Sequence, residues 1–164
     1  MEVEVKILEV DREIIERKLE QLGAIKVSSG EVHSLYFSHG GDEIRVREED
    51  GKVMICTKRK VVNDEAKVRE ETEMEAPSMK NAEQLLTAIG FTLVDETYKY
   101  RVVYEKDGIR YVLDKYRKRY ELPLFLEIEG NSVNEVYGAL SELGYSKEDA
   151  RPWSRKELFA HYKK

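Results

Sequence analysis

Charged side chains gather on one face of the strands that this sequence predicts. Residues 2–7 alternate strictly, so that Glu2, Glu4 and Lys6 share one face while apolar side chains occupy the other. Neighbours on the same face of a strand lie about 6.7 Å apart, close enough for two carboxylates to hold one divalent cation or two adjacent ones. Because the pattern recurs on later segments with acids and bases mixed, we expect a polar interior that binds metal.

The same alternation collects two nearly balanced sets of charges. The bases are Lys6, Arg45, Arg47, Lys58, Arg69, Lys99 and Arg101, and the acids are Glu2, Glu4, Glu71, Glu73, Asp114, Glu127 and Glu129. Burying an unpaired charge costs several kcal/mol, so such an interior requires mutual pairing, water and a strongly anionic ligand. A polyphosphate fits, because Arg and Lys pair with its oxygens while carboxylates hold Mg²⁺ or Mn²⁺ that bridges the same phosphates.

Two hairpins organise the strands that carry these charges. Asp50-Gly51 and Asp107-Gly108 are typical of tight two-residue turns. They join strands at 44–47 and 53–58 and at 98–106 and 109–116, and further strands follow at about 66–75 and 122–129. With the first strand and one near 32–37, about eight mostly antiparallel strands are predicted, enough to close a barrel that has no free edge.

Four helices with apolar stripes are predicted to pack around these strands. Three begin at the capping residues Asp11, Ser78 and Ser132 and end at Gly23, Gly90 and Gly144, and the last begins near Ser154. Their stripes need the uncharged strand faces, so the charged faces must look inward. The predicted fold class is α+β, a closed eight-stranded antiparallel barrel with helices outside, and residues 58–64 are expected to form a mobile polar connection.

Composition narrows the classes of function. At 164 residues the chain predicts a single domain over 1–164. A net charge of −5 and a pI near 5.4 argue against a general nucleic-acid-binding protein. No apolar run reaches the roughly 18 residues of a membrane span, and acids at positions 2 and 4 argue against a secretory leader, so we expect a cytoplasmic protein with no membrane partner. Cys56 has no partner for an internal disulfide and is interpreted as a small core residue.

The order of the charged motifs resembles that of the CYTH superfamily, the triphosphate tunnel metalloenzymes. Glu2-x-Glu4-x-Lys6 looks like the ExExK signature of that family. The later motifs Arg45-x-Arg47, Thr57-Lys58, Arg69-x-Glu71-x-Glu73, Lys99-x-Arg101, Asp114 and Glu127-x-Glu129 resemble its successive strand motifs in order. The resemblance therefore spans almost the whole sequence.

The resemblance implies a tunnel that binds a triphosphate group and a divalent metal, Mg²⁺ or Mn²⁺. The resemblance implies that the metal ligands, or residues that closely support them, are Glu2, Glu4, Asp114, Glu127 and Glu129. The phosphates would be held by Lys6, Arg45, Arg47, Lys58, Arg69, Lys99 and Arg101. Glu71 and Glu73 would orient those bases or assist the metal. Glu2, Glu4 and Lys6 are the candidate catalytic residues.

The motifs leave the reaction open. One interpretation is hydrolysis of inorganic, thiamine or nucleoside triphosphate, and another is conversion of ATP to cyclic AMP and pyrophosphate, as in class IV adenylyl cyclases. Many nucleotide-cyclising members have an acid where this chain has Ser34, which favours hydrolysis. The late Ser-Tyr signature is present only as Ser154-Arg155, so no substrate role is assigned to the last helix. A polyphosphate or nucleotide sensor without turnover is the alternative from another class, and the sequence leaves a homodimer open.

Overall fold

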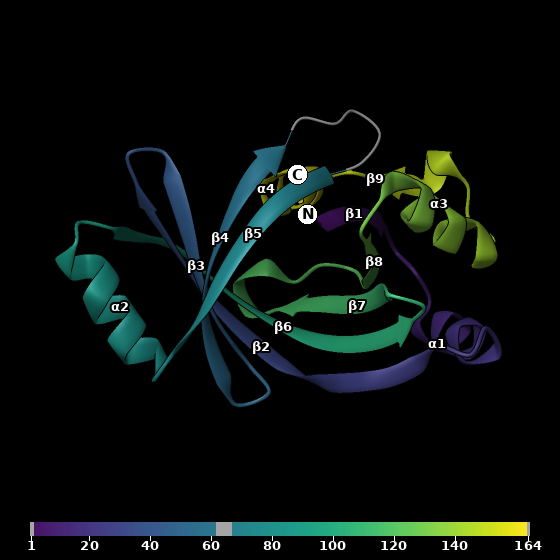
Figure 1. The fold of residues 1–164 in the computed structure, drawn as a ribbon, viewed down its shortest axis with the longest axis horizontal. Coiled ribbons are helices and arrows are strands. Elements are labelled where there is room, and N and C mark those ends of the chain that lie inside the picture. The colour runs from purple at the N-terminus through teal and green to yellow at the C-terminus, as the bar shows by residue number, and fades with distance from the viewer. Residues whose placement is uncertain (1, 62–66, 164) are drawn as a thin grey trace.

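The computed structural model describes residues 2–61 and 67–163, with backbone but not side chains for 58–61 and 67–70 (Figure 1). The elements in chain order are β1 (Glu2–Ile7), α1 (Arg12–Gln21), β2 (Ile25–His39), β3 (Asp42–Glu49), β4 (Lys52–Val61), β5 (Lys67–Ala76), α2 (Met79–Ala88), β6 (Thr92–Lys106), β7 (Ile109–Arg117), β8 (Phe125–Gly130), α3 (Val133–Glu142), β9 (Ala150–Arg151) and α4 (Arg155–Tyr162). Short 3₁₀ turns at Lys118–Tyr120 and Lys147–Asp149 complete the set. The α+β class is confirmed.

The strands form one antiparallel sheet in the order β5-β4-β3-β2-β6-β7-β8-β1-β9. β1 also pairs with β5, from Glu2 opposite Arg69 to Glu4 opposite Lys67, so the two ends of the sheet meet over a short stretch. Among the residues described, the rest of β5 pairs only with β4. The sheet is therefore curved but not closed into a complete barrel, and the prediction of a closed eight-stranded barrel was wrong on closure and on strand number.

The ninth strand explains the difference in number. β9 consists of two residues that pair with Lys6 and Ile7 of β1. Two residues are too few to show an alternating pattern, so the sequence gives no signal for this strand. It covers part of the edge of β1 that β5 leaves open, which reduces the number of exposed backbone groups there.

Both hairpin turns have the backbone that their sequences predict. Asp50 and Gly51 have φ of +51° and +73°, and Asp107 and Gly108 have φ of +50° and +80°. Positive φ at both central residues is the type I′ geometry, which matches the twist of paired strands and favours Asp followed by Gly. The turns fix the register in which Arg47 lies opposite Met54 and Arg101 lies opposite Asp114.

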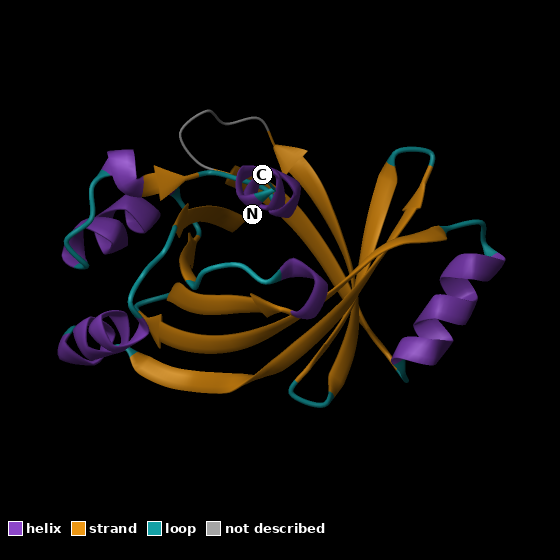
Figure 2. Cartoon of the chain, turned by 180° about the vertical axis from the view of Figure 1, so that it is seen from behind, coloured by secondary structure: helices purple, strands orange, loops and turns teal. Residues whose placement is uncertain are grey.

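Helices α1, α2 and α3 lie on the outside of the curved sheet and bury its apolar face (Figure 2). Val5 of β1 is fully buried in one cluster with Ile15 and Leu19 of α1 and Val136 of α3. At the other end of the sheet, Ala82 and Leu86 of α2 pack on Val46 of β3 in a second cluster. The prediction that the uncharged strand faces support the helices is confirmed for α1, α2 and α3, and the charged faces consequently look to the concave side.

The prediction was wrong for α4, which does not lie outside the sheet. Its residues Leu158 and Phe159 pack on Tyr116 of β7 and Phe125 of β8, and Tyr116 and Leu158 also line the cavity on the concave side.

The helix limits follow their capping residues. The side chains of Asp11, Ser78, Ser132 and Ser154 each accept a hydrogen bond from the backbone three residues on. The expected polar connection at 58–64 was wrong in its first part, because β4 continues to Val61, and residues 62–64 lie outside the described chain. Of the helices in the described ranges, none combines the length and the apolar character needed to cross a membrane.

Candidate active site

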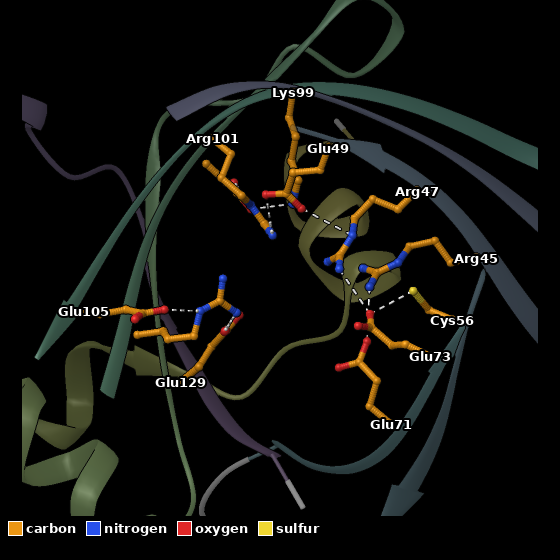
Figure 3. Close-up of polar contacts among 12 residues, drawn as sticks. Arg45, Arg47, Glu49, Cys56, Glu71, Glu73, Lys99, Arg101, Glu105 and Glu129 are labelled. Carbon is orange, nitrogen blue, oxygen red and sulfur yellow. Dashed lines mark hydrogen bonds and ion pairs between the residues drawn. The ribbon is translucent and has the colours of Figure 1, made fainter. Parts of the chain in front are cut away.

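A cavity of about 380 Å³ lies on the concave side of the sheet, and the alternating charged residues line it. The predicted residues that line it are Glu2, Glu4, Lys6, Arg45, Arg47, Glu71, Glu73, Lys99, Arg101, Glu127 and Glu129. Figure 3 shows side chains from β3, β5, β6 and β8 directed toward one open centre. Segments up to 127 residues apart in the sequence thus place their charges around one space, as the shared alternation predicts.

Three predicted site residues are not among the described residues that line the cavity. Asp114 is fully buried and does not border the cavity. Lys58 and Arg69 belong to β4 and β5, and their side chains lie outside the described structure. The backbone register places Lys58 opposite Glu71 and Arg69 opposite both Lys60 and Glu2. Their contact with phosphate stays a prediction.

One side of the cavity is a network of buried, mutually paired charges. We call Glu4, Lys6, Lys99, Arg101, Asp114 and Glu127 the paired wall. Asp114 accepts two hydrogen bonds from Arg101, both of 2.8 Å, and a third from Lys99 Nζ. Lys6 Nζ lies 3.1 Å from Glu4 Oε1 and 2.9 Å from Glu127 Oε1. The two parallel hydrogen bonds from Arg101 to the Asp114 carboxylate fix the orientation of both side chains and favour the ionised form of Asp114.

The charges of the paired wall shift one another's pKa values. Burial acts to raise the pKa of Asp114, but the positive charges of Arg101 and Lys99 outweigh it and hold that pKa below its usual value. Burial, followed by the neighbouring Arg101, lowers the pKa of Lys99. Asp114 therefore stays ionised as the counterion of two cations, and its oxygens are directed at them. Both oxygens of Asp114 thus contact the bases, and its role as a metal ligand or a close support of the site stays a prediction.

The opposite side of the cavity is more accessible. We call Arg45, Arg47, Cys56, Glu71 and Glu73 the open wall. Arg45 Nη2 lies 3.2 Å from Glu71 Oε1, and Arg47 Nη2 lies 3.1 Å from Glu73 Oε1. The side chain of Glu73 is 32% exposed, whereas that of Asp114 is 0% exposed. Neither contact is a fork of two parallel hydrogen bonds to one carboxylate, and both arginines line the cavity.

Cys56 belongs to this wall rather than to an apolar core. It is buried as predicted, but its thiol donates a 2.9 Å hydrogen bond to the same Glu73 oxygen that Arg47 contacts. Burial and this hydrogen bond raise the pKa of Cys56 despite the nearby Arg45. Burial raises the pKa of Glu73, but the donors Cys56 and Arg47 overcome this and lower it on balance. The thiol thus supports an ionised Glu73.

Two buried donor atoms of the open wall are incompletely satisfied. Arg45 Nε and Arg47 Nε have no hydrogen-bond acceptor in the described part of the chain. Arg47 Nε lies 3.3 Å from Glu49 Oε2, but the direction is not that of a hydrogen bond. A buried donor without an acceptor is costly, and native proteins place such atoms where a ligand or water completes the bond. This is the local chemistry that an anionic group with several oxygens would satisfy.

A cluster of three carboxylates supplies the chemistry for a divalent cation. Oxygens of Glu2, Glu4 and Glu129 lie within 4.8 Å of one another. Glu4 and Glu129 are direct cross-strand partners on β1 and β8. Like charges in that position are unfavourable, and a shared cation removes the repulsion. Carboxylate oxygens are also the ligands that Mg²⁺ and Mn²⁺ prefer, so the residues present fit a divalent metal.

The environment of Glu129 agrees with this interpretation. Burial, and after it the charges of Glu127 and Glu2, raise the pKa of Glu129 although Arg110 acts in the opposite direction. Arg110 Nη1 lies 2.9 Å from Glu129 Oε2. A cation among these carboxylates would compete with a proton on Glu129 and would stabilise its ionised form.

The start of α4 contributes side chains that the sequence analysis did not assign. Ser154, Arg155, Lys156 and Leu158 line the cavity. The Arg155 guanidinium lies 3.6 Å from the centre of the Tyr36 ring, which also lines the cavity. No substrate role was assigned to this helix from the sequence, because its Ser-Tyr signature is present only as Ser154-Arg155. The charge of Arg155 next to the cap Ser154 was the signal that could have suggested otherwise.

Arg155 is held in this position by the β6 residue Asp95. The two side chains form an ion pair, and Tyr120 donates a 2.7 Å hydrogen bond to the other oxygen of Asp95. Burial raises the pKa of Asp95, but these two donors outweigh it and lower the pKa below its usual value. Arg155 thereby connects α4 to the rim of the cavity.

The fold and the charged cavity together agree with the family that sequence comparison identifies. The model of the CYTH domain matches residues 1–152. The chain therefore belongs to the CYTH family, and the resemblance of its motifs is confirmed.

Individual relatives match this chain over most of their own length. A Methanocaldococcus jannaschii protein with the provisional name adenylate cyclase MJ0240 is 27% identical over 152 residues, which cover 87% of this chain and 85% of the relative. The structure of the PH1012 protein of Pyrococcus horikoshii OT3 is similar with a TM-score of 0.82 and 28% identity, covering 96% of this chain and 99% of that one. A provisionally named adenylate cyclase from Vibrio parahaemolyticus has a TM-score of 0.81 at 13% identity, covering 97% of each chain, and shares the fold.

Proposed function

We propose that this protein is a divalent-metal-dependent enzyme that hydrolyses a triphosphate in the charged cavity. The observation that carries the proposal is that guanidinium groups and clustered carboxylates line one cavity of about 380 Å³. Guanidinium groups with unsatisfied buried donors lie on the open wall, and three clustered carboxylates lie at Glu2, Glu4 and Glu129. A triphosphate with its cation would satisfy both at once.

Each part of the cavity has a distinct role in this proposal. Arg45 and Arg47 bind phosphate oxygens, because their planar forks match phosphate geometry and keep their charge at any working pH. Glu2, Glu4 and Glu129 would hold Mg²⁺ or Mn²⁺, which when bound would supply Lewis-acid stabilisation of phosphoryl charge. The paired wall keeps Lys6, Lys99 and Arg101 fixed in orientation, so their charge requires little reorganisation when the substrate enters.

The position of the metal cluster relative to the bases supports this division. Lys6 shares Glu4 with the carboxylate cluster through a 3.1 Å contact. A phosphate group bound near the cation would therefore also lie near the Lys6 ammonium. Preorganised cations of this kind stabilise negative charge on a leaving diphosphate, and this is the main contribution a protein makes to phosphoryl transfer.

A second candidate is cyclisation of ATP, favoured by one specific observation. The Methanocaldococcus jannaschii relative, at 27% identity over most of both chains, has the provisional name of an adenylate cyclase. Cyclisation would use the same hold on the triphosphate, with the ribose hydroxyl as the attacking group and pyrophosphate as the product. Hydrolysis is preferred because Ser34 is buried and neutral where cyclising members have an acid.

A substrate panel tests the proposal and separates the two reactions. Tripolyphosphate, ATP and thiamine triphosphate are incubated with the protein and Mg²⁺ or Mn²⁺, and each is analysed for phosphate, pyrophosphate and cyclic AMP. Hydrolysis predicts metal-dependent release of phosphate without cyclic AMP, whereas equal amounts of cyclic AMP and pyrophosphate from ATP would indicate the cyclase. Binding of all three without turnover would contradict both and indicate a sensor.

Matched variants assign the activity to the cavity. Glu2→Gln should remove most of the turnover, because it removes one charge from the candidate metal cluster. Glu75→Gln on β5 is the control, since Glu75 is exposed and does not line the cavity. Both variants should unfold at the same temperature as the wild type within about 2 °C, as expected for surface or half-buried substitutions. Equal loss of activity in both would contradict the assignment.

A further inference from the structure

A second cavity, of about 230 Å³, lies on the opposite face of the sheet from the charged cavity. The two share no lining residue. Strand alternation explains the separation: Arg101 and Asp114 are directed at the concave side, whereas Val102 and Leu113 next to them form the floor of the second cavity. We call this second cavity the outer pocket.

The outer pocket has an apolar floor with one aromatic wall. Val102 and Leu113 are almost fully buried, and Leu124 completes the floor from the segment before β8. The ring of Tyr100 borders the same space. An apolar floor beside an aromatic ring favours a flat hydrophobic group, because such groups release water on binding and stack on aromatic faces.

The rim of the pocket is positively charged. It is formed by Arg12 at the start of α1 and by Lys115 and Arg117 of β7. The guanidinium carbons of Arg12 and Arg117 lie 5.8 Å and 5.2 Å from the centre of the Tyr100 ring. No acidic residue lines the pocket within the described ranges, although the whole chain has a net charge of −5. The rim therefore attracts anions locally.

The existing partners of these cations leave them able to bind a ligand. Arg12 pairs with Glu16 at 3.4 Å and Arg117 pairs with Glu31 at 2.6 Å. The side chains of Arg12 and Arg117 are 46% and 51% exposed, so these pairs are weak and solvated. Lys115 Nζ donates a hydrogen bond to the Leu122 carbonyl, an uncharged acceptor that does not neutralise the ammonium.

We propose that the outer pocket binds a small aromatic anion, a single ring that bears a phosphate or carboxylate group. The ring would occupy the apolar floor beside Tyr100, and the anionic group would contact Arg12, Lys115 and Arg117. The volume of 230 Å³ limits the size, because pockets for drug-sized ligands usually have about 300–1,000 Å³. This site is independent of the triphosphate reaction proposed for the other face.

Titration of phenyl phosphate, followed by the backbone amide signals in NMR spectra, tests this site. The expected shifts occur at Val102, Leu113 and their neighbours in β6 and β7. Phenol and inorganic phosphate, which each lack one half of the ligand, should bind at least tenfold more weakly. Benzoate distinguishes a carboxylate from a phosphate group, and the tighter of the two aromatic anions identifies the preferred one.

Variants distinguish the outer pocket from the charged cavity. Arg117→Gln and Tyr100→Leu should each weaken phenyl phosphate binding at least fivefold when it is followed at the Val102 and Leu113 signals, whereas Arg47→Ala in the charged cavity should not change the affinity measured at these signals. The proposal is overturned if the shifts occur only around the charged cavity, if neither aromatic anion shifts the Val102 and Leu113 signals, or if inorganic phosphate shifts these signals with the same affinity as phenyl phosphate.

Discussion

The two walls of the charged cavity differ in how completely their charges are paired. In the paired wall, Asp114 is 0% exposed and accepts three hydrogen bonds from Lys99 and Arg101. In the open wall, Arg45 and Arg47 form no fork on a carboxylate, and each has a buried Nε without a hydrogen-bond acceptor in the described structure. The charges of the first wall are hydrogen-bonded to one another, whereas the second wall keeps two donor atoms that a ligand or water could satisfy.

This difference implies that the two walls contribute differently to the stability of the fold and to ligand binding. Removing a partner from a buried, fully paired network leaves an uncompensated charge in a region of low dielectric. Removing a partially exposed charge costs little, because water replaces its partner. We therefore expect substitutions in the paired wall to change mainly the free energy of unfolding, and substitutions in the open wall to change mainly ligand binding.

The largest effect on stability is expected for Asp114→Asn. The substitution leaves Lys99 and Arg101 without their shared counterion, so the free energy of unfolding should fall by about 3–5 kcal/mol. Chemical denaturation measures this change. The matched variant Glu73→Gln in the open wall should cost less than about 1 kcal/mol. Equal losses in the two variants would show that the walls do not differ in the way described.

The reverse pattern is expected for Arg47→Ala. Loss of a charge-assisted contact to phosphate should weaken tripolyphosphate binding by about 2 kcal/mol, roughly thirtyfold, while the free energy of unfolding changes by less than about 1 kcal/mol. Calorimetric titration in the presence of Mn²⁺ measures the affinity. Arg17→Ala on the exposed side of α1 is the control and should bind as the wild type does. Unchanged affinity in Arg47→Ala would contradict the role of the open wall.

The charges of the carboxylate cluster, which would bind the metal, are expected to lower the stability of the metal-free protein. The raised pKa of Glu129 means that its ionised form is disfavoured in the fold, so stability falls as the pH rises through that pKa. Glu129→Gln should therefore raise the free energy of unfolding of the metal-free protein near pH 7, by a few tenths to about 1 kcal/mol. Thermal unfolding with and without Mn²⁺ measures both effects.

The same experiment has a second readout. Mn²⁺ should raise the unfolding temperature of the wild type and of Glu75→Gln, but much less that of Glu129→Gln, because a ligand stabilises only the state that binds it. A variant that is less stable without metal and equally stabilised by Mn²⁺ would place the cation elsewhere.

An effect of similarly small size is expected at the contact between α4 and β6. The pKa of Asp95 is lowered in the folded state, so its contribution is complete above the unfolded value of about 3.9 and is lost as the pH falls toward the folded value. Asp95→Asn should therefore destabilise the protein by about 1 kcal/mol at pH 7 and by progressively less below pH 4. Denaturation curves across this range measure the difference, and a constant difference would rule out titration of Asp95 as its cause.

Strand alternation was sufficient to predict most of the cavity. Glu2, Glu4 and Lys6 share a face because successive side chains of a strand point to opposite faces. The same alternation of charged residues on other strands indicated one common polar interior. The hairpins at Asp50-Gly51 and Asp107-Gly108 were equally predictable, since positive φ selects these residues. Such features depend on residues near one another in the chain.

The features that were missed depend on distant contacts. The two-residue strand β9 exists because β1 offers an edge, and the incomplete closure between β1 and β5 depends on how the whole sheet curves. Arg155 reaches the cavity because Asp95, 60 residues earlier, holds it. Cys56 was assigned to the core from its residue type, whereas its contact with Glu73 depends on the pairing of β4 with β5.

The most direct measurement of the central claim is a crystal structure of the protein with tripolyphosphate and Mn²⁺, with the metal located by its anomalous scattering. We expect Mn²⁺ within bonding distance of Glu2, Glu4 and Glu129, and phosphate oxygens in contact with Arg45 and Arg47. The hydrogen bonds that Lys99 and Arg101 donate to Asp114 should be unchanged. Phosphate bound outside the cavity, or Asp114 released from its cations to bind the metal, would contradict this claim.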